Sequence, residues 1–433
     1  MRNLDLSDHG RAALLSGFSV CCLTLDPLAE HVPHFLLLYV AALFVLLPYV
    51  VGAKQIFDGR KGSVVIIVLW SLVMRLPLLM SSPSLSDDVY RYVWEGRVTA
   101  SGVDPFEHPP TAPALRDLAL QAPEWSRVNH PELPAIYPPA AQLAFASLGQ
   151  VADTERGFRV GFVCIELLLI LALAALLLAR RLPLGWLVLY AWHPMSVVEV
   201  AGSGHYEPLA MLPLVLGLLW AGRLRAWPVW GLAFSLKFLG AVPAVFVVAR
   251  LVRDGRWRRA LLGVGLAGAV VAAVTLPFAL DGTLPLGSLG TYLRHWGHNA
   301  SIYSLLSFPL GYHPARKVVL VLSIAWTLFL LVRGMSLDKG FLLVAVGVLL
   351  LSPVVHPWYG LWLLVLLPVF PGLPLFLLSG LLPLSYFAWV VQAHGGGWAV
   401  PAWVLALEYG LPALALLVGF LRPRSGPVDA TVP

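Results

Sequence analysis

Residues 158–179 read FRVGFVCIELLLILALAALLLA, and this stretch decides the class of fold. Only Arg159 and Glu166 carry charge in it. A helix needs roughly 17 to 25 apolar residues to cross about 30 Å of hydrocarbon, so the stretch is long enough to span a bilayer. We therefore take the membrane as the solvent around this segment.

Comparable apolar runs recur along all 433 residues, of which 59% are hydrophobic and only 12% charged. Globular domains carry about a quarter charged residues, so a soluble protein is excluded and an all-α membrane bundle is expected. The net charge of +6 comes from basic residues in short connections between the runs, as the positive-inside rule predicts, which argues against a nucleic-acid partner. The three cysteines, Cys21, Cys22 and Cys164, lie in apolar stretches and predict no disulfide framework.

The basic connections also predict the topology, with both termini in the cytoplasm and a short cytoplasmic tail at 422–433. Lys54, Arg60 and Lys61 mark one cytoplasmic loop, and the five arginines of 250–259 mark the strongest. The expected spans are 10–27, 34–52, 62–81, 158–179, 184–202, 206–222, 260–280, 316–333, 340–355, 357–371, 373–393 and 398–421. The segment 226–249 lies between two cytoplasmic markers, so we expect a short hairpin bent near Lys237 to Pro243. The chain is thus expected to form one membrane domain, 1–421, with about 12 to 14 spans in all.

Polar sequence gathers on one side of this predicted topology. A long loop at 81–157, expected to carry short amphipathic helices, and a second loop at 281–315 both fall on the outer face. Most histidines after residue 100 lie in or beside the outer loops. Ionisable side chains gathered at one face of a membrane protein predict a functional site at that face.

The long loop opens with Ser86-Asp87-Asp88-Val89-Tyr90-Arg91-Tyr92-Val93-Trp94-Glu95-Gly96. Ser86 is a good N-cap, and acidic residues in a first helical turn complement the helix dipole. The same placement would fix a carboxylate at the boundary between lipid and water. Helical spacing predicts one shared face for Asp88, Arg91, Tyr92 and Glu95.

This opening, continued through Ser101-Gly102-Val103-Asp104-Pro105-Phe106, resembles the first extracytoplasmic loop of bacterial GT-C-type glycosyltransferases. The polyprenyl-phosphate-mannose-dependent mannosyltransferases of actinobacterial lipoglycan synthesis and glycosyltransferase family 87 are the most similar groups. Further matches, in the family's order, span roughly residues 60 to 370: Ile136–Pro139, His193-Pro194, Gly202–Glu207, Ser235–Lys237, Asn299–Tyr303 and Ser352–Tyr359. The resemblance implies a GT-C fold in the plasma membrane and an inverting transfer of a sugar, mannose first, to an extracytoplasmic glycan or glycolipid.

The resemblance also implies roles for residues. Asp88 takes the place of the catalytic base, with Asp87 as a neighbour that assists it. Glu95 and Glu207 stand where relatives usually have Asp, which leaves the sugar or acceptor preference open.

Such a transfer needs a base for the acceptor hydroxyl and preorganised cations or donors for the departing lipid phosphate. We assign the donor to residues that combine cations, imidazoles, amides and an aromatic ring near the outer face: Arg91, His205, Glu207, Lys237, Arg294, His298, Asn299, His356 and Tyr359. We assign the acceptor to Tyr92, Trp94, Glu95 and Tyr137. Glu199 is a further candidate for sugar hydroxyls or for positioning the base, and Glu408 has no functional interpretation.

No zinc-type ligand spacing is present, so no metal ligand is assigned. GT-C enzymes differ in their use of a divalent cation, and the resemblance leaves such a cofactor open. Two other classes of function compete. A secondary transporter would also have about twelve spans and buried charges, but its charges should lie near the midplane of repeated halves, and no repeat is visible. A catalytically inactive scaffold would tolerate substitution of Asp88.

Overall fold

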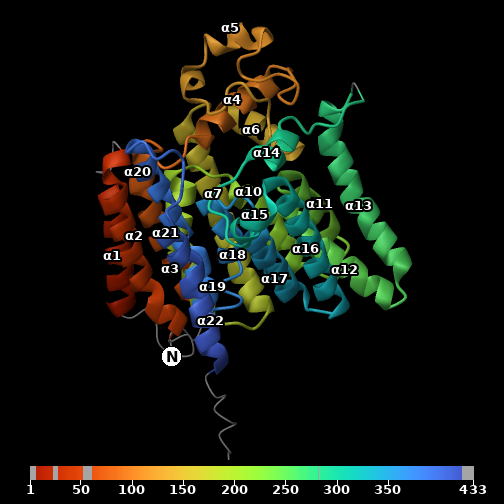
Figure 1. The fold of residues 1–433 in the computed structure, drawn as a ribbon. Coiled ribbons are helices and arrows are strands. Elements are labelled where there is room, and N and C mark those ends of the chain that lie inside the picture. Colours follow the sequence, from red (N-terminus) through yellow and green to blue (C-terminus); the bar gives the residue numbers. More distant parts are fainter. Residues whose placement is uncertain (1–5, 23–27, 52–60, 281, 422–433) are drawn as a thin grey trace, which may run out of the picture.

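The computed structural model describes residues 6–22, 28–51, 61–280 and 282–421. Within these residues every regular element is a helix, apart from one isolated bridge between His298 and Val354, which confirms the all-α class. Figure 1 shows the helices of the body packed side by side, with residues 81–157 forming a crown at one end. The turn between α12 (Val242–Arg253) and α13 (Trp257–Thr275) lies at the opposite end.

Six helical segments are long and apolar enough to cross a membrane: His31–Val51, Glu155–Ala179, Trp257–Phe278, Tyr312–Val332, Leu373–Ala393 and Ala402–Leu421. Shorter apolar helices, Val64–Met80, Glu207–Leu219 and Ala226–Leu236, accompany them. The chain is therefore a helical membrane protein, while the expected total of 12 to 14 spans stays a prediction. Lys54, Arg60, the expected end of the first span at 23–27 and the tail at 422–433 lie outside the described residues.

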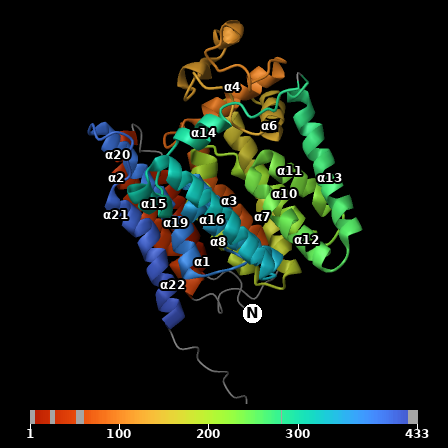
Figure 2. The ribbon, with the colours of Figure 1, turned by 45° about the vertical axis from the view of Figure 1, so that its right-hand side comes forward.

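The helices that form the body fall close to the predicted spans. The long ones are α1 (Leu6–Cys21), α2 (Leu28–Val51), α3 (Lys61–Met80), α7 (Glu155–Ala179), α13, α16 (Tyr312–Val332) and α17 (Leu337–Leu351). Helix α13 lies at the edge of the bundle in Figures 1 and 2, and only 11% of its apolar window is buried inside the protein. Most of its side chains therefore face the surroundings of the bundle.

The predicted hairpin is confirmed. Helix α11 (Ala226–Leu236) ends at Lys237, whose extended backbone breaks the helix. A short 3-10 turn, η6 (Phe238–Ala241), then leads into α12. The break frees the Lys237 side chain from the helix surface and turns it toward the start of α10 (Glu207–Leu219).

Two predicted spans are wrong as continuous helices. Residues 184–202 form four short pieces: η4 (Leu184–Leu187), α8 (Val188–Ala191), α9 (Pro194–Ser196) and the π-helical η5 (Val197–Gly202). Residues 357–371 form η8 (Pro357–Gly360), α18 (Leu361–Leu364) and turns. Prolines interrupt both segments, and irregular backbone is tolerated at membrane depth where protein buries it. Hydropathy alone predicts that such a segment lies within the membrane, but it does not predict where its helices break.

Two buried arginines fasten these irregular pieces. Arg75 of α3 forms a fully buried ion pair with Glu166 of α7, with Nε 2.6 Å from Oε2, and it also donates to the carbonyl of Ala191. Arg159 of α7 donates to the carbonyls of Leu78 and Ala201. Together they satisfy carbonyls that a regular helix would have paired internally, and they hold the end of η5 in place.

The crown has a small core of its own. Helix α4 (Asp88–Ala100) packs against α6 (Pro139–Gly149), and Trp94 and Val98 join Leu115, Ala122 and Val128 in one apolar cluster. The remaining crown elements are the short turns η2 (Pro113–Leu115), α5 (Arg116–Ala119) and η3 (Pro123–Arg127). The short helices are as expected, but α4 is not amphipathic, because the cluster buries one side and the body the other.

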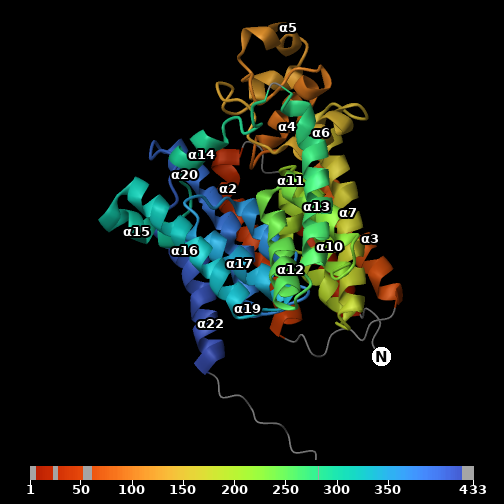
Figure 3. The ribbon, with the colours of Figure 1, turned by 90° about the vertical axis from the view of Figure 1, so that its right-hand side faces the viewer.

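The second predicted loop contains α14 (Leu289–His295), near the base of the crown in Figure 3, and α15 (Ile302–Leu310), which lies further from the crown at the side of the body. The chain then closes with α19 (Leu373–Leu381), η9 (Leu382–Phe387), α20 (Ala388–Ala393), α21 (Ala402–Leu405), the π-helical η10 (Ala406–Gly410) and α22 (Leu411–Leu421). Glu408 of η10 is fully buried, and the side chain of Asn299 lies beside it. The segment before α15 therefore packs against η10 near the end of the chain.

Candidate active site

Asp88 stands where the crown meets the body, as the first residue of α4. Its backbone N–H donates to the hydroxyl of Ser86 at 3.3 Å, and Asp87 occupies the cap position expected for Ser86. The amide Nδ2 of Asn129 lies 2.8 Å from Oδ1 of Asp87 and 2.8 Å from Oδ1 of Asp88, so one loop residue holds both carboxylates. The Asp88 side chain remains 16% exposed.

The pKa of Asp88 is raised to about 6. Burial is the largest cause, followed by the negative charge of Asp87. The hydrogen bond from Asn129 and the positive charge of Lys237 act in the opposite direction, because both favour the ionised carboxylate. A carboxyl group with this pKa is ionised at neutral pH and basic enough to accept a proton from a hydroxyl under attack.

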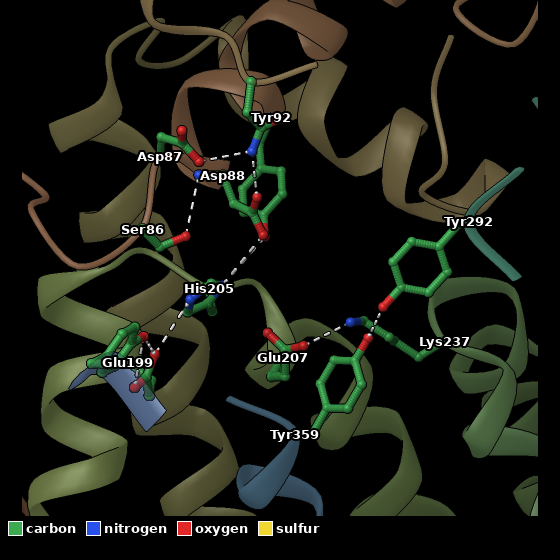
Figure 4. Close-up of polar contacts among 12 residues, drawn as sticks. Ser86, Asp87, Asp88, Tyr92, Glu199, His205, Glu207, Lys237, Tyr292 and Tyr359 are labelled. Atoms are coloured by element: carbon green, nitrogen blue, oxygen red, sulfur yellow. Dashed lines mark hydrogen bonds and ion pairs between the residues drawn. The ribbon is translucent and has the colours of Figure 1, made fainter. Parts of the chain in front are cut away.

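A line of polar side chains runs from Asp88 into the body (Figure 4). Oδ2 of Asp88 lies 3.5 Å from the hydroxyl of Tyr92 and 3.9 Å from Nδ1 of His205. Nε2 of His205 in turn lies 3.3 Å from Oε2 of Glu199, which accepts a hydrogen bond from Tyr386 at 2.9 Å. Burial lowers the pKa of His205 well below its usual value, so its imidazole is neutral.

Lys237 supplies a cation opposite Asp88 (Figure 4). Its Nζ lies 2.7 Å from Oε1 of Glu207 and 4.9 Å from the centre of the Tyr206 ring, and its side chain is 23% exposed. The second oxygen of Glu207, Oε2, is buried and has no hydrogen-bond partner among the described residues. An unsatisfied buried acceptor is costly, which makes it a good place for a hydroxyl of a bound sugar.

Aromatic rings line the space between these groups. The hydroxyls of Tyr292 and Tyr359 lie 2.7 Å apart (Figure 4). His205 stacks on Trp358 with ring centres 3.9 Å apart, Trp358 on His356 at 4.4 Å, and His356 on His298 at 5.2 Å. Burial lowers the pKa of His298 to about 4 and the pKa of His356 well below its ordinary value. This column is therefore uncharged, and Lys237 is the main cation facing it.

Three of the predicted binding residues make structural contacts within the crown. All five N–H groups of Arg91 are used, by Glu95 and by the carbonyls of residues 129, 130, 133 and 134. Glu95 is 2% exposed, and its second oxygen accepts from Gln142 at 2.6 Å. Trp94 belongs to the core of the crown. These side chains therefore hold the backbone and core of the crown, and the predicted donor contact of Arg91 and acceptor contacts of Trp94 and Glu95 stay predictions.

Two more predicted donor residues lie apart from Asp88. Arg294 is exposed on α14, where its Nε donates to the carbonyl of Gly290. Asn299 faces Glu408, and its carbonyl accepts from the hydroxyl of Tyr409 at 2.7 Å. The helical face predicted for Asp88 and Tyr92 is confirmed. Tyr137 packs edge-on against Tyr92 at 4.9 Å and keeps its place among the acceptor candidates.

Sequence reasoning missed Asn129 and Tyr292 as parts of this site. Asn129 lies 41 residues beyond Asp88 in a polar stretch of the crown, with no local pattern to mark it. Tyr292 comes two residues before the predicted Arg294. In a helix with 3.6 residues per turn, positions two apart point to nearly opposite sides, so Tyr292 and Arg294 cannot both face the site. This spacing is the sequence signal that makes Tyr292 an alternative to Arg294.

A metal site was left open by the sequence. Among the residues that the structure describes, no group of three His, Cys, Asp or Glu side chains is placed to hold a metal ion.

Comparison with known proteins identifies relatives of this chain. The family model described as alpha-(1->6)-mannopyranosyltransferase, N-terminal domain, matches residues 11–253. Alpha-(1->6)-mannopyranosyltransferase B of Corynebacterium glutamicum is 28% identical over 81% of this chain and 67% of that relative. A probable alpha-(1->6)-mannopyranosyltransferase of Mycolicibacterium smegmatis is 25% identical over 73% of this chain and 66% of that relative. No solved structure matches. The family model covers more than half of the chain and most of the residues around Asp88, so the chain belongs to the alpha-(1->6)-mannopyranosyltransferase family and is a membrane-embedded glycosyltransferase.

Proposed function

We propose that this enzyme moves mannose from a polyprenyl-phosphate donor to a glycan or glycolipid acceptor outside the cytoplasm, with inversion at the anomeric carbon. One observation carries the proposal: Asp88, with its pKa raised to about 6, lies within range of the positive charge of Lys237, and both side chains are partly exposed at the base of the crown. The family supplies mannose as the sugar, and the apolar body supplies the setting for a lipid-linked donor.

In this proposal Asp88 removes the proton from the acceptor hydroxyl as that oxygen attacks the anomeric carbon. Asp87 assists through its charge, which keeps Asp88 basic, and Asn129 and Tyr92 orient the carboxylate. Positioned general bases of this kind accelerate reactions about 10²- to 10⁴-fold. Tyr137 lies beside Tyr92 and is our candidate for contact with the acceptor sugar.

The bond that breaks joins the anomeric carbon to the phosphate oxygen of the donor, so negative charge grows on the departing lipid phosphate. Lys237 stabilises that charge from a poorly hydrated position, with the Tyr292 and Tyr359 hydroxyls as further donors. The free Oε2 of Glu207 accepts a hydroxyl of the mannose, and the neutral face of His356 packs against the sugar ring. One base and one direct displacement give inversion.

We further propose that the crown lies outside the cytoplasm and that the chain crosses the membrane about twelve times. The arginine-rich turn between α12 and α13 lies at the end of the molecule opposite the crown (Figure 1). Basic ends of membrane helices favour the cytoplasmic side, which leaves Asp88 outside.

The test compares Asp88→Asn with Asp117→Asn, the same exchange at an exposed carboxylate of the crown. Each purified protein receives radiolabelled polyprenyl-phosphate mannose and membrane acceptors, and transfer is measured as labelled product. We expect Asp88→Asn to lose about 10²- to 10⁴-fold in turnover, while Asp117→Asn keeps the rate of the original protein. Equal turnover by all three would refute the assigned base. Uptake of a solute into proteoliposomes without a glycosidic product would support a transporter instead.

A further inference from the structure

A large cavity lies at the end of the body away from Asp88. It has a volume of about 840 Å³ and is lined by the α12–α13 turn, by the start of α17 and by residues that follow α10. Figures 1 and 3 place the α12–α13 turn at the end of the body away from the crown. This cavity takes no part in the proposed transfer.

The lining is strongly basic. Five arginines contribute to it: Arg180, Arg250, Arg253, Arg256 and Arg259. Against them stand Asp254 and Asp338. Arg180 is neutralised by Asp338 at 2.5 Å, and Arg250 lies 3.9 Å from Asp254.

Three of the arginines remain uncompensated. Arg253, Arg256 and Arg259 form no ion pair with a carboxylate among the described residues. Arg253 donates its Nε to the carbonyl of Ala249, and Arg259 donates to the carbonyl of Gly222, so backbone contacts aim both side chains. The positive-inside rule accounts for basic residues at this end, but it does not require them to surround one hollow.

The rest of the wall is apolar. Trp227, Phe246 and Leu251 line the same cavity. On the flanking helices, Leu261 and Leu262 of α13 and Val332 of α16 are each more than half exposed. A basic hollow beside lipid-facing helices at the expected membrane surface suits a ligand with a phosphate head and an apolar tail.

We infer that this cavity binds the phosphate head group of an anionic membrane lipid, through Arg253, Arg256 and Arg259, with the acyl chains lying along α13 and α16. A soluble phosphate compound shares the head-group chemistry but makes no use of the apolar surface beside the cavity. The two sources of phosphate are therefore separated by experiment.

The experiment uses the full chain in nanodiscs of phosphatidylcholine containing a minor fraction of phosphatidylglycerol. After release into detergent, native mass spectrometry counts the phosphatidylglycerol molecules that stay bound. The test variant is Arg253→Gln with Arg256→Gln. The matched control is Arg258→Gln with Arg333→Gln, which removes the same charge from exposed arginines that do not line the cavity.

We expect the original protein and the control to retain phosphatidylglycerol equally. The test variant should bind it about thirtyfold more weakly, since each basic contact with an anionic head group contributes roughly fivefold. Thermal unfolding in detergent should show that the test variant is folded. Equal retention by test and control variants would overturn the proposal in favour of general surface attraction. Displacement of the lipid by inorganic pyrophosphate, with equal affinity in the absence of lipid, would overturn the assignment to a membrane lipid.

Discussion

At the scale of single residues, Asn129 affects the pKa of Asp88 although it is not assigned a step in the proposed reaction. Its amide bridges the two neighbouring carboxylates of Asp87 and Asp88, which would otherwise repel each other without relief. The bridge lowers the pKa of Asp88, while burial and Asp87 raise it. The basicity of Asp88 is thus a balance between these opposing contacts.

This balance predicts opposite shifts in the pH dependence of kcat/KM. Asp88 must be ionised to accept a proton, so activity should rise as the pH passes upward through about 6. Asn129→Ala removes a bond that favours the ionised form, so the acid limb should move to higher pH. Asp87→Asn removes a negative neighbour, so the limb should move to lower pH.

Initial rates across the acid range, at substrate concentrations well below KM, give both limbs. Gln121→Ala serves as control because Gln121 is an exposed amide of the same crown that bonds only the carbonyl of Asp117 in the hydrogen bonds described. Its limb should stay in place. Limbs that fail to move in either variant would show that another group titrates.

Some residues of the site could be predicted from local sequence, and others could not because their contacts come from distant parts of the chain. Asp88 and Tyr92 could be found from a short motif, because residues four apart share a helical face. Lys237 could be found because a lone ammonium in an apolar hairpin calls for a partner, and Glu207 is that partner at 2.7 Å. The structural contacts of Arg91 could not be predicted, because sequence does not reveal that its guanidinium donates to distant carbonyls at 129–134.

At the scale of elements, the irregular segment at 197–206 places His205. Glu199 sits in the π-helical η5, and Gly204 follows with φ of +79°, a left-handed conformation that glycine adopts without strain. A Cβ on Gly204 would meet Cγ of Arg159 at 2.8 Å and Cγ2 of Val89 at 3.0 Å. The segment therefore has room for only one residue type at this point.

Gly204→Ala should destabilise the protein by at least about 1 kcal/mol from backbone strain alone. It should also lower turnover by up to about a hundredfold, because a displaced His205 no longer faces Asp88. Gly202→Ala is the matched control, since its nearest neighbour would be Leu78 at 3.8 Å. Thermal unfolding in detergent and turnover well below the melting temperature measure the two effects. A Gly204→Ala enzyme as active as Gly202→Ala would contradict this role for the segment.

The elements also show the limits of hydropathy. The hairpin at 226–249 was predicted from the charges at its two ends. The breaks in 184–202 and 357–371 were not, because the groups that satisfy their freed carbonyls come from far along the chain. Arg75 reaches Ala191 from 116 residues away, and no local window contains both.

At the scale of the whole molecule, the two ends of the body differ in chemistry. The crown end carries the carboxylates, imidazoles and tyrosines of the site, and the opposite end carries the arginine-rich cavity. The distribution of charged residues in the sequence predicted this difference between the two ends. The number of membrane crossings depends on the broken segments, which hydropathy predicted as continuous spans.

The polarity predicts which end is reached from outside the cell. A cysteine at Leu120, which is 80% exposed in the crown, should react with a membrane-impermeant maleimide in intact cells. A cysteine at Asp254, in the α12–α13 turn, should react only after the membrane is opened. Both variants are built with Cys21, Cys22 and Cys164 replaced by alanine. Labelling of Asp254→Cys in intact cells, with Leu120→Cys protected, would reverse the proposed orientation.

The contacts that Asn129 makes across 41 and 42 residues shorten the loop that matters for Asp88. These hydrogen bonds close the loop at the base of the crown. The residues between Asp88 and Asn129, which form the tip of the crown, are therefore not needed to hold the carboxylate. Lengthening a flexible appendage is cheap, since each doubling of a loop costs only about 0.6 kcal/mol. Insertions at the tip of the crown should therefore leave the position of the Asp88 carboxylate unchanged.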